Sequence, residues 1–495
     1  MGLKEFLLGN RWVLAVWLLP ISFIYDLIWY VRSKYVFWAG SAPKKHDERV
    51  KYVQKQVRDW QTLGKGRKMC TARPQWMSIS QQKINYKSTS YQVEVNLMDI
   101  LNIDTDKMVV TCEPMVSIGR LIDLLIPLGY TVPIVPEIGD LTVGGLVMGG
   151  GIESTSHKYG LWQHICPRYE IVVADGTLME CSKDKNSDLY YVIPWSYGTF
   201  GFLTALDIQI IPYKSYIRLE YQPTYTMEES MKVFDHETRK ESGNDSVEGI
   251  MYSRDKGVIM TGVFTDECEK DKYNPIGRWY KPWFFTEVVK VLDEGKKVEY
   301  IPTKDFYFRH NKPFFWLTDV WVPFGNHPIF RYLFGYLLPY NYGLLKLINE
   351  RVMPTQLTEN FVVQDFGIPA KYFKTAIDFF DDIVGIYPLW LCPARALDTG
   401  PIHSLKDEDE IHIDIGIYGH CKKPKYDKVE TLRAMEKFAR DYNGYQGLYA
   451  ETLMTYEEFK EMFDGTTYFK VRNSLPLTEE AFPEVYHKVS KMGRT

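Results

Sequence analysis

Six glycines fall within one short stretch of this chain, and they limit its fold more than any other feature. The stretch from Asp140 to Gly160 reads DLTVGGLVMGGGIESTSHKYG. Glycine permits positive φ angles and lets a ligand approach the backbone, and successive free N–H groups form a concave site for an anion. The spacing GG-x-x-x-GGG matches neither a P-loop nor the G-x-G-x-x-G of a dinucleotide fold. From the glycines alone, a diphosphate site and a tight turn packed against another backbone are both open.

The composition is that of a globular protein with more than one domain. The chain has 495 residues, of which 45% are hydrophobic and 25% charged, and a single core seldom serves that length. The net charge is -4, and no block of lysine and arginine with interleaved aromatic residues occurs, so we expect no nucleic acid partner. The cysteines are scattered and include no C-x-x-C pair, which predicts reduced thiols and no zinc site. They are Cys70, Cys112, Cys166, Cys181, Cys268, Cys392 and Cys421.

The N-terminal segment differs from the rest of the chain. From Trp12 to Val31 the sequence WVLAVWLLPISFIYDLIWYV is interrupted only by a proline, a serine and Asp26, and its length suits a helix across a bilayer. Aromatic residues at both ends and basic residues after it predict a single-pass transmembrane anchor over residues 1–43, with the large C-terminal part in the cytosol. A cleaved signal peptide, suggested by WAGSA at 38–42, and a buried core helix are the alternatives.

Beyond this anchor, short strands and helices alternate, which predicts an α+β fold. The predicted elements are a polar helix over 44–60, strands over 91–97 and 108–114, a helix over 116–129, hairpins over 169–181 and 247–264, a strand over 411–419, a helix over 429–444, and a helix begun by a capping box of Thr455 and Glu458. They group into a first domain over 44–212, a second domain over 213–440 and a C-terminal segment over 441–495.

A series of motifs carries a family resemblance. Residues 136–212 contain, in order, TVGG, a glycine triplet, YG, the strand turn VVADG, the helix DLYY and the turn GTFGF. This series resembles the FAD-binding domain of the vanillyl-alcohol oxidase superfamily. Further segments narrow the resemblance to the Δ24-sterol reductase, or Diminuto/Dwarf, family: DLTVGGLVMGGGIESTSHKYGLWQHIC, KPWFF at 281–285, PFGNHPIFRYLFG at 323–335, YPLWLCP at 387–393 and EEFKEMFDG at 457–465.

The resemblance implies a PCMH-type FAD-binding domain, an antiparallel-sheet domain that caps the substrate, and a C-terminal segment that returns to the flavin. The FAD-binding residues it implies are Arg73 in the early loop CTARPQW at 70–76, and Thr142, Gly144, Gly145, Gly149, Gly150, Gly151, Ile152, Glu153, Ser154, Thr155, Ser156, His157, Lys158, Tyr159, Gly160, Leu161 and Trp162. Structural roles remain open for Ser154 and Thr155, which could cap a helix, and for His157, which could satisfy a carbonyl group.

Relatives with covalent flavin use a histidine in the early loop or a cysteine just before TVGG. This chain has neither, because Asp140 and Leu141 precede Thr142. We therefore expect FAD to be bound without a covalent bond. The early loop also lacks the usual serine and glycine pair, which leaves its phosphate contacts open.

The reaction that the resemblance implies is NADPH-driven reduction of the C24=C25 double bond of a sterol side chain. That alkene has no neighbouring carbonyl group, so a proton donor must assist the hydride in a dry pocket. Three candidates for the donor are Tyr449 and Glu451 in YQGLYAETLM, which share a face if that segment is extended, and His310. Each has a structural alternative, namely a packed tyrosine, a solvated glutamate and a hydrogen-bonded histidine.

The expected partners are a sterol and membrane lipid. The apolar but interrupted segment at 328–348 either lies at the membrane surface or substrate entrance, or belongs to the core. The family implies the endoplasmic reticulum membrane, with the Golgi membrane as an alternative, and pairing into a homo-oligomer is open. A flavin oxidase or dehydrogenase of the same superfamily and a flavin scaffold without catalysis are the competing functions.

Overall fold

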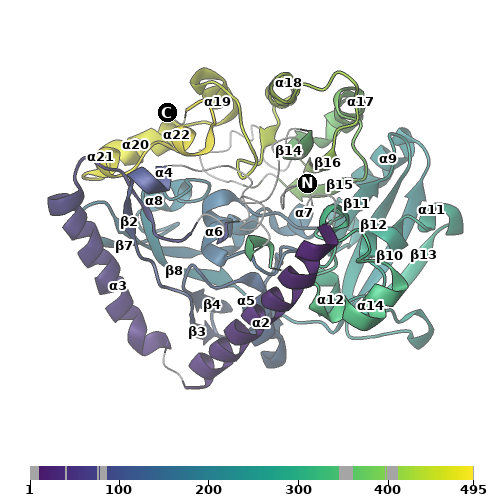
Figure 1. Cartoon of the computed structure of the whole chain (residues 1–495), viewed down its shortest axis with the longest axis horizontal. Helices are drawn as coiled ribbons and strands as arrows, with labels where there is room; N and C mark the ends of the chain where they lie inside the picture. The colour runs from purple at the N-terminus through teal and green to yellow at the C-terminus, as the bar shows by residue number, and fades with distance from the viewer. Residues whose placement is uncertain are drawn as a thin grey trace.

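The computed structural model describes residues 11–39, 42–74, 77–78, 86–339, 341–344, 360–395, 397 and 411–493, and only the backbone of residues 11–16, 37 and 321. Two antiparallel sheets form the body of the molecule, one at the left and one at the right of Figure 1. The C-terminal helices lie above the first sheet in that view, and the two N-terminal helices lie at its left edge and across its front. The predicted combination of helices with antiparallel sheets is confirmed.

Five strands form the first sheet, in the order β3-β4-β8-β6-β7, and every neighbouring pair is antiparallel. β6 and β7 form the predicted hairpin, whose turn contains Gly176 at φ +85°. Glycine suits that position because other residues rarely adopt a positive φ. The strands are β3 (Ile100–Asp104), β4 (Val109–Cys112), β6 (Arg168–Val173), β7 (Leu178–Ser182) and β8 (Gly201–Gln209).

Short elements complete this first domain. The parallel pair β1 (Met69–Thr71) and β2 (Tyr91–Val93) precedes the sheet, and β2 is shorter than the strand predicted over 91–97. In the predicted helix over 116–129, Ser117 accepts a hydrogen bond from the backbone N–H of Arg120 and starts α5. The remaining elements are α4 (Tyr86–Thr89), α5 (Ile118–Leu125), β5 (Tyr130–Thr131), α6 (Val143–Gly149), α7 (Ser156–Tyr159), α8 (Ser187–Val192) and β9 (Ile211–Pro212).

Eight strands form the second sheet, called the cap sheet here, in the order β13-β10-β12-β11-β15-β16-β14-β17. Neighbouring strands are antiparallel throughout, and the predicted hairpin over 247–264 is confirmed as β11 and β12. The edge strand β17 comes from the C-terminal segment. The strands are β10 (Tyr216–Thr224), β11 (Ser246–Met251), β12 (Gly257–Thr265), β13 (Lys297–Pro302), β14 (Phe361–Pro369), β15 (Leu389–Arg395), β16 (Ile411–His420) and β17 (Tyr445–Gln446).

The two faces of the cap sheet have different roles. Side chains alternate along a strand, and on β14 the ring of Phe366 stacks 5.7 Å from Phe380 of α17, so Asp365 points to the opposite face. Figure 1 shows α9, α17 and α18 on the outer side of this sheet. The helices of this domain are α9 (Met227–Glu237), α10 (Phe284–Val288), α11 (Val291–Glu294), α12 (Thr303–Tyr307), α13 (Thr318–Trp321), α14 (Pro328–Phe334), α17 (Phe373–Ile383) and α18 (Lys428–Asp441).

The C-terminal helices return to the first domain. The capping box is confirmed: Thr455 accepts from the N–H of Glu458, and the Glu458 carboxylate accepts from the N–H of Thr455. The buried guanidinium of Arg472 donates to the carbonyl oxygens of Thr199 and Phe482, each at 2.9 Å, and so ties these helices to the GTFGF turn. The helices are α19 (Tyr456–Met462), α20 (Thr466–Ser474), α21 (Thr478–Ala481) and α22 (Val485–Val489).

Ion pairs hold the N-terminal helices α2 (Arg11–Trp38) and α3 (Ala42–Asp59) against the first domain. Arg32 of α2 and Arg49 of α3 each lie 2.8 Å from the buried carboxylate of Asp99. Arg49 also pairs with buried Glu113 at 3.0 Å. The polar helix predicted over 44–60 is confirmed as α3.

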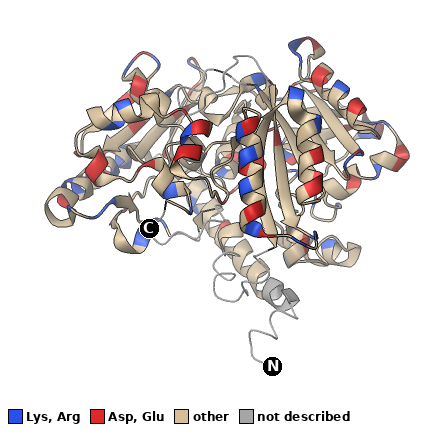
Figure 2. Ribbon diagram, turned by 90° about the horizontal axis from the view of Figure 1, so that it is seen from above, with Lys and Arg blue, Asp and Glu red and all other residues tan. Residues whose placement is uncertain are grey.

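The helix α2 has one buried and one exposed side. Leu18, Leu19 and Ser22 are buried, whereas Trp17 and Ile28 are exposed. Figure 2 shows charges of both signs over the body of the protein and few on this helix, which leads to the N-terminus. In the described part of the chain, no helix combines the length and apolarity required to cross a bilayer. Gly40 and Ser41 of WAGSA lie outside the described residues.

A buried ion-pair network joins the first domain to the cap sheet. The guanidinium of Arg309, just after α12, lies 2.5 Å from the Glu153 carboxylate, which follows the glycine triplet, and 2.6 Å from the Glu248 carboxylate on β11. Glu248 also accepts from the indole N–H of Trp390 at 3.0 Å. Although burial opposes ionisation, the Arg309 charge holds the pKa of Glu248 well below its usual range.

We predict that Arg309→Met lowers the free energy of unfolding by roughly 3–5 kcal/mol, because it leaves two carboxylates buried without their partner. Urea unfolding followed by tryptophan fluorescence measures this change. The matched control is Arg254→Met, since Arg254 pairs with Asp378 at the surface and such pairs contribute about 0–1 kcal/mol. If the two variants have equal free energies of unfolding, the Arg309 ion pairs do not stabilise the fold more than a surface ion pair does.

Candidate functional site

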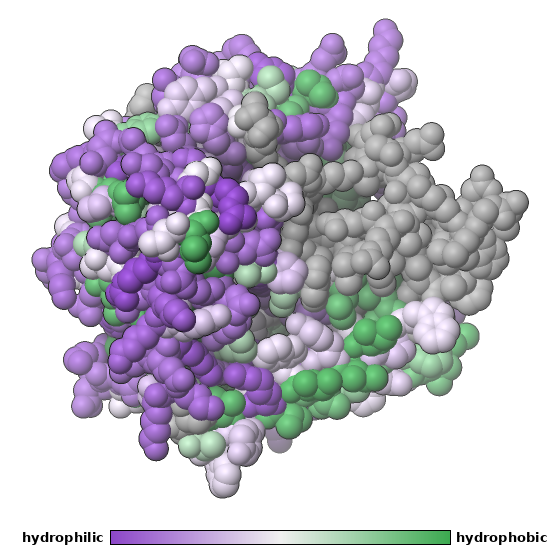
Figure 3. Space-filling view, turned by 60° about the vertical axis from the view of Figure 1, so that its left-hand side comes forward, coloured by the Kyte–Doolittle hydropathy of each residue, from purple (hydrophilic) through white to green (hydrophobic). Residues whose placement is uncertain are grey.

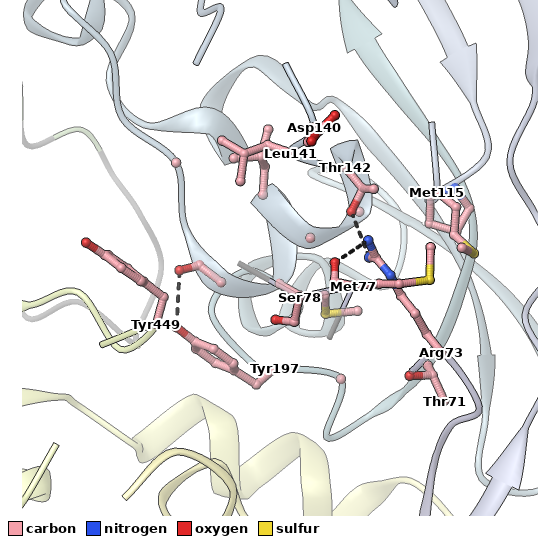
Figure 4. Close-up of a pocket in the computed structure, with 18 of the residues that line it drawn as sticks. Thr71, Arg73, Met77, Ser78, Met115, Asp140, Leu141, Thr142, Tyr197 and Tyr449 are labelled. Carbon is pink, nitrogen blue, oxygen red and sulfur yellow. Dashed lines mark hydrogen bonds between the residues drawn. The ribbon is translucent and has the colours of Figure 1, made fainter. Parts of the chain in front are cut away.

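A cavity of about 910 Å³ lies between the two sheets. This volume is at the upper end of the range of roughly 300–1,000 Å³ for small-molecule sites. Its walls come from the early loop, the glycine stretch, β8, the inner face of the cap sheet and the C-terminal segment. Figure 4 shows part of this wall, with Arg73 and Thr142 at one side and Tyr449 at the other.

The glycine stretch lines the cavity and is also tightly packed behind it. The predicted residues on the wall are Thr142, Gly144, Gly145, Gly149, Gly150, Gly151 and Ile152. Gly150 has φ +89°, and a Cβ there would lie 2.6 Å from the Trp195 ring. A Cβ on Gly144 would lie 2.5 Å from Pro114. The glycine stretch therefore has both roles that the sequence left open. Its glycines leave space for a ligand on one side and pack closely against neighbouring residues on the other.

Arg73 links the early loop to the glycine stretch. Its guanidinium donates to Thr142 Oγ1 at 3.4 Å and to the carbonyl oxygen of Met77 at 2.9 Å, as Figure 4 shows. Its Nε is buried and has no hydrogen-bond partner among the described residues. Gln75 and Trp76 of the early loop lie outside the described part of the chain. Arg73 thus offers a buried N–H group beside the wall that the resemblance assigns to a phosphate.

Two lysines join Arg73 on the cavity wall. Lys87 donates to the carbonyl oxygens of Thr71 and Arg73, and Lys488 of α22 donates to that of Tyr197. Burial lowers the pKa of Lys488 to about 8 and also lowers that of Lys87. Within the described residues no carboxylate lies at ion-pair distance from either ammonium group. The three cations are half-buried, and a cation withdrawn from water favours a compensating charge, so this end of the cavity is suited to an anion.

The opposite end of the cavity carries hydroxyl and carboxyl groups. Asp365 of β14 accepts a hydrogen bond from Tyr418 Oη at 2.5 Å and another from Tyr449 Oη. Burial raises the pKa of Asp365 to about 6. Burial, together with the Asp365 charge, also raises the pKa of Tyr449 well above its usual range. Aromatic side chains line the same region, among them Phe314, Phe315 and Trp390.

Glu137 is a further acid on the cavity wall. Burial and the neighbouring Glu153 carboxylate raise its pKa well above the usual range. Glu137 Oε2 is buried and has no hydrogen-bond partner in the described chain. Arg309 pairs with Glu153, whereas no cation of the described residues pairs with Glu137.

The predicted flavin residues after Ile152 do not line the cavity. Ser154 accepts from Ser246 Oγ of β11, and Ser156 accepts from the N–H of Glu153. The two ring nitrogens of His157 lie 3.0 and 3.2 Å from the carbonyl oxygens of Ser154 and Asn244, so this side chain has the structural role that was left open. The residues outside the cavity wall are Glu153, Ser154, Thr155, Ser156, His157, Lys158, Tyr159, Gly160, Leu161 and Trp162.

Of the three candidate proton donors, the structure brings only Tyr449 to the cavity. Tyr449 lies in a turn closed by the N–H of Ala450, which donates to the carbonyl oxygen of Gly447 at 3.1 Å, so Glu451 does not share the direction of Tyr449. Its carboxylate pairs with Lys428 at 2.7 Å and Lys491 at 3.1 Å, and although burial opposes them, these charges lower its pKa. His310 is buried behind the wall, where its Nε2 lies 3.1 Å from Glu248.

Comparison with known proteins identifies the family. Residues 54–182 match the family of FAD-binding domains. The chain is 46% identical to the human protein named Delta(24)-sterol reductase over 496 aligned residues, which cover 100% of this chain and 96% of that protein. The chain belongs to the Delta(24)-sterol reductase family. Other members are a Delta(24)-sterol reductase homolog of Caenorhabditis elegans, 39% identical over 99% of this chain and 96% of that protein, and the Delta(24)-sterol reductase of Pisum sativum, 32% identical over 99% and 93%.

The residues present fit the FAD of this family. The glycine stretch leaves room beside its backbone, and the half-buried cations Arg73, Lys87 and Lys488 provide donors for the two negative charges of a diphosphate. When bound, FAD supplies hydride transfer, while the protein supplies orientation and exclusion of water.

Sequence reasoning missed Lys87, Lys488, Asp365, Tyr418 and Glu137. None belongs to a motif with fixed spacing, and Lys87 and Lys488 are separated by most of the chain. One signal was available for Glu137, a carboxylate just before the glycine stretch. Side chains alternate between the two faces along β14 and β16. The sequence does not say which face lies against the cavity, so it could not identify Asp365 and Tyr418 as cavity residues.

We predict that Lys488→Met weakens FAD binding about tenfold to a hundredfold, because a hydrogen bond to a charged group contributes roughly 1.5–3 kcal/mol. Titration of the apoprotein with FAD, followed by flavin fluorescence, measures the dissociation constant. Lys491→Met is the control, since that neighbouring lysine is exposed and pairs with Glu451. If both variants bind FAD as the unsubstituted protein does, Lys488 has no role in holding the diphosphate.

Proposed function

We propose that this protein reduces the C24=C25 double bond of a sterol side chain, with electrons from NADPH that pass through non-covalently bound FAD. The observation that carries the proposal is the position of Tyr449, a hydroxyl donor, in the same cavity as the glycine stretch. Membership of the family and the FAD-binding match support it.

The chemistry explains why both ends of the cavity are needed. An isolated alkene has no carbonyl oxygen to accept the charge of an added hydride. Protonation at C24 places positive charge on the more substituted C25, which then accepts the hydride. A proton donor must therefore face the alkene in a site from which water is excluded. Phe314, Phe315 and Trp390 supply the apolar surroundings for such a side chain.

Tyr449 is the proposed donor at C24. Its hydroxyl is hydrogen-bonded to Asp365, which fixes the position of its oxygen in the wall. Tyr418 holds the other oxygen of the same carboxyl group at 2.5 Å. The two tyrosines and the carboxyl group orient one another, so the donor is held in place before substrate binds.

The non-covalent attachment of FAD has its own support. Asp140 and Leu141 stand where relatives with covalent flavin have a cysteine, and both line the cavity. We infer from this substitution that FAD is released intact when the protein unfolds.

We predict that NADPH bleaches the flavin absorption of the purified protein under anaerobic conditions, and that desmosterol restores it. Tyr449→Phe should slow the sterol-dependent restoration by about 10²- to 10⁴-fold, the usual contribution of general acid catalysis, and leave the reduction by NADPH unchanged. Stopped-flow absorption measures both steps. Tyr307→Phe is the control, because this buried tyrosine lies outside the cavity wall and bonds to Thr131.

Two results would contradict the proposal. Restoration of the flavin band by oxygen alone would favour the oxidase or dehydrogenase of the same superfamily. Restoration by desmosterol at an unchanged rate in Tyr449→Phe would remove Tyr449 as the donor but leave the reaction itself in place.

An apolar surface supports attachment to a membrane. On α2 the exposed residues include Trp17, Ile21, Ile24 and Ile28. The exposed residues of α14 and η7 (Gly335–Leu337) continue this surface, since the Phe23 ring contacts the Tyr336 ring at 6.0 Å. We call the two together the apolar ridge; its other members are Leu27, Val31, Ile329, Tyr332, Leu333 and Phe334. Figure 3 shows exposed hydrophobic side chains gathered along one edge of the molecule.

One residue of α2 connects the ridge helix to the cavity. Trp29 of α2, the helix that carries part of the ridge, lines the cavity wall, and we infer that a sterol enters the cavity from the bilayer beside this helix. We propose that the ridge holds the protein on the endoplasmic reticulum membrane with its catalytic part in the cytosol. In this proposal, the described part of the segment at 328–348 lies at the membrane surface. Residues 340 and 345–348 of the segment lie outside the described residues.

We predict that Ile24→Asp combined with Leu333→Asp reduces binding of the protein to phosphatidylcholine vesicles, because charge in the ridge opposes its burial among acyl chains. Flotation on a density gradient measures the bound fraction. Leu63→Asp is the matched control, since Leu63 is 78% exposed and lies outside the ridge. Equal flotation of both variants would mean that the ridge does not contact lipid.

A further inference from the structure

Asp365 is placed as the centre of a hydrogen-bonded group at the cavity wall. Tyr418 Oη donates to its Oδ1 at 2.5 Å, and Tyr449 Oη donates to its Oδ2. All three side chains line the cavity. In this arrangement both hydroxyl protons point to the carboxylate, so Tyr449 has no proton directed at a substrate.

Protonation of Asp365 reverses one of these hydrogen bonds. A protonated carboxyl group is a donor as well as an acceptor. With the proton on Oδ2, Asp365 donates to Tyr449 Oη, and the hydroxyl proton of Tyr449 is released to point into the cavity. Tyr418 continues to donate to Oδ1. The same atoms thus form either a resting group or a proton donor, according to the charge of Asp365.

Burial raises the pKa of Asp365, although the hydrogen bonds from Tyr418 and Tyr449 lower it. Asp414 of β16 is buried near Asp365, and burial together with the Asp365 charge raises its pKa well above the usual range. The titratable side chains that face Asp365 are Tyr418 and Asp414 of β16, Tyr445 of β17 and Tyr449. No lysine, arginine or histidine of the described chain contributes to the pKa of Asp365. A buried carboxyl group without a nearby cation tends to keep its proton.

We propose that Asp365 supplies the proton that Tyr449 delivers to the substrate, with Tyr418 as the residue that positions Asp365. This inference rests on the proposed function, because it specifies the source of the proton for the reduction of the alkene.

The step is balanced as follows. The O–H bond of Tyr449 breaks and a C–H bond forms at C24 as the π bond opens. The O–H proton of Asp365 moves to the Tyr449 oxygen, which leaves Asp365 as a carboxylate. The hydride that adds at C25 carries the two electrons that NADPH supplied through FAD. Asp365 recovers its proton from water between turnovers, and NADPH has become NADP⁺.

The test is the pH dependence of the sterol step in a single turnover of the FAD-loaded protein. With flavin reduced by NADPH under anaerobic conditions, desmosterol is added between about pH 5 and about pH 8. The rate of flavin reoxidation should fall about tenfold for each pH unit above the pKa of Asp365, which burial raises to about 6, because only the protonated form delivers a proton. Asp365→Asn should be at least about a hundredfold slower, with no such dependence on pH.

The Tyr418→Phe variant tests whether Tyr418 positions Asp365 or only supports the fold around it. The hydrogen bond from Tyr418 lowers the pKa of Asp365, so its removal should move the fall in rate to higher pH. The control for Asp365→Asn is Glu436→Gln, because Glu436 is a buried carboxyl group whose pKa burial raises to about 7, and it lies outside the cavity wall. That variant should keep the unsubstituted pH profile, and all variants should keep their FAD content and the rate of reduction by NADPH.

The proposal is overturned if Asp365→Asn reoxidises at the unsubstituted rate or retains the same pH dependence. A shift to lower pH in Tyr418→Phe would also overturn it. If desmosterol fails to reoxidise even the unsubstituted protein, the proposed function fails instead. The infrared carbonyl band of a protonated carboxyl group, lost in Asp365→Asn, then tests the inference without turnover, and absence of that band at low pH would overturn it.

Discussion

The ion pairs of Arg309 with Glu153 and Glu248 are the interaction on which the site depends. Glu153 lies two residues after the glycine triplet, and Glu248 belongs to the cap sheet, so one guanidinium joins the two walls of the cavity. The planar donors of arginine can bind two carboxylates at once, which the point charge of lysine does less well. All three side chains are buried, and each carboxylate would oppose folding if the guanidinium were absent.

The cavity between these walls is divided by charge. Arg73, Lys87 and Lys488 gather at one end, and Asp365 with its two tyrosines lies in another part of the wall. This separation has a chemical consequence. A cation near Asp365 would lower the pKa of its carboxyl group and remove its proton, whereas the phosphate groups of a dinucleotide need cations close by. One cavity can therefore bind an anionic cofactor and still hold a neutral acid.

Local features were predicted well from the sequence, and longer-range ones less so. The capping box at Thr455 and the hairpin at Gly176 depend on residues a few positions apart, so the sequence is sufficient to predict them. The predicted flavin-binding residues fall into two groups on either side of Ile152. The glycines before it face the cavity, whereas Ser154 and His157 form hydrogen bonds with residues of β11 and the loop before it. That division depends on the cap sheet, which is remote in sequence. Tyr449 and Glu451 likewise point apart because a turn replaces the extended segment that their spacing suggested.

The sequence by itself determined the α+β class, the family and the loop on which a diphosphate can lie, because glycine spacing, hairpin turns and ordered motifs are properties of neighbouring residues. The tertiary structure decided which side chains share the cavity. Asp365 reaches Tyr418 through the pairing of β14 with β16. Lys488 reaches Tyr197, and Asp365 reaches Tyr449, only after the C-terminal segment adds β17 to the cap sheet and returns to the first domain. Such contacts join residues far apart in the chain, and burial then sets their pKa values, which no local pattern of residues can specify.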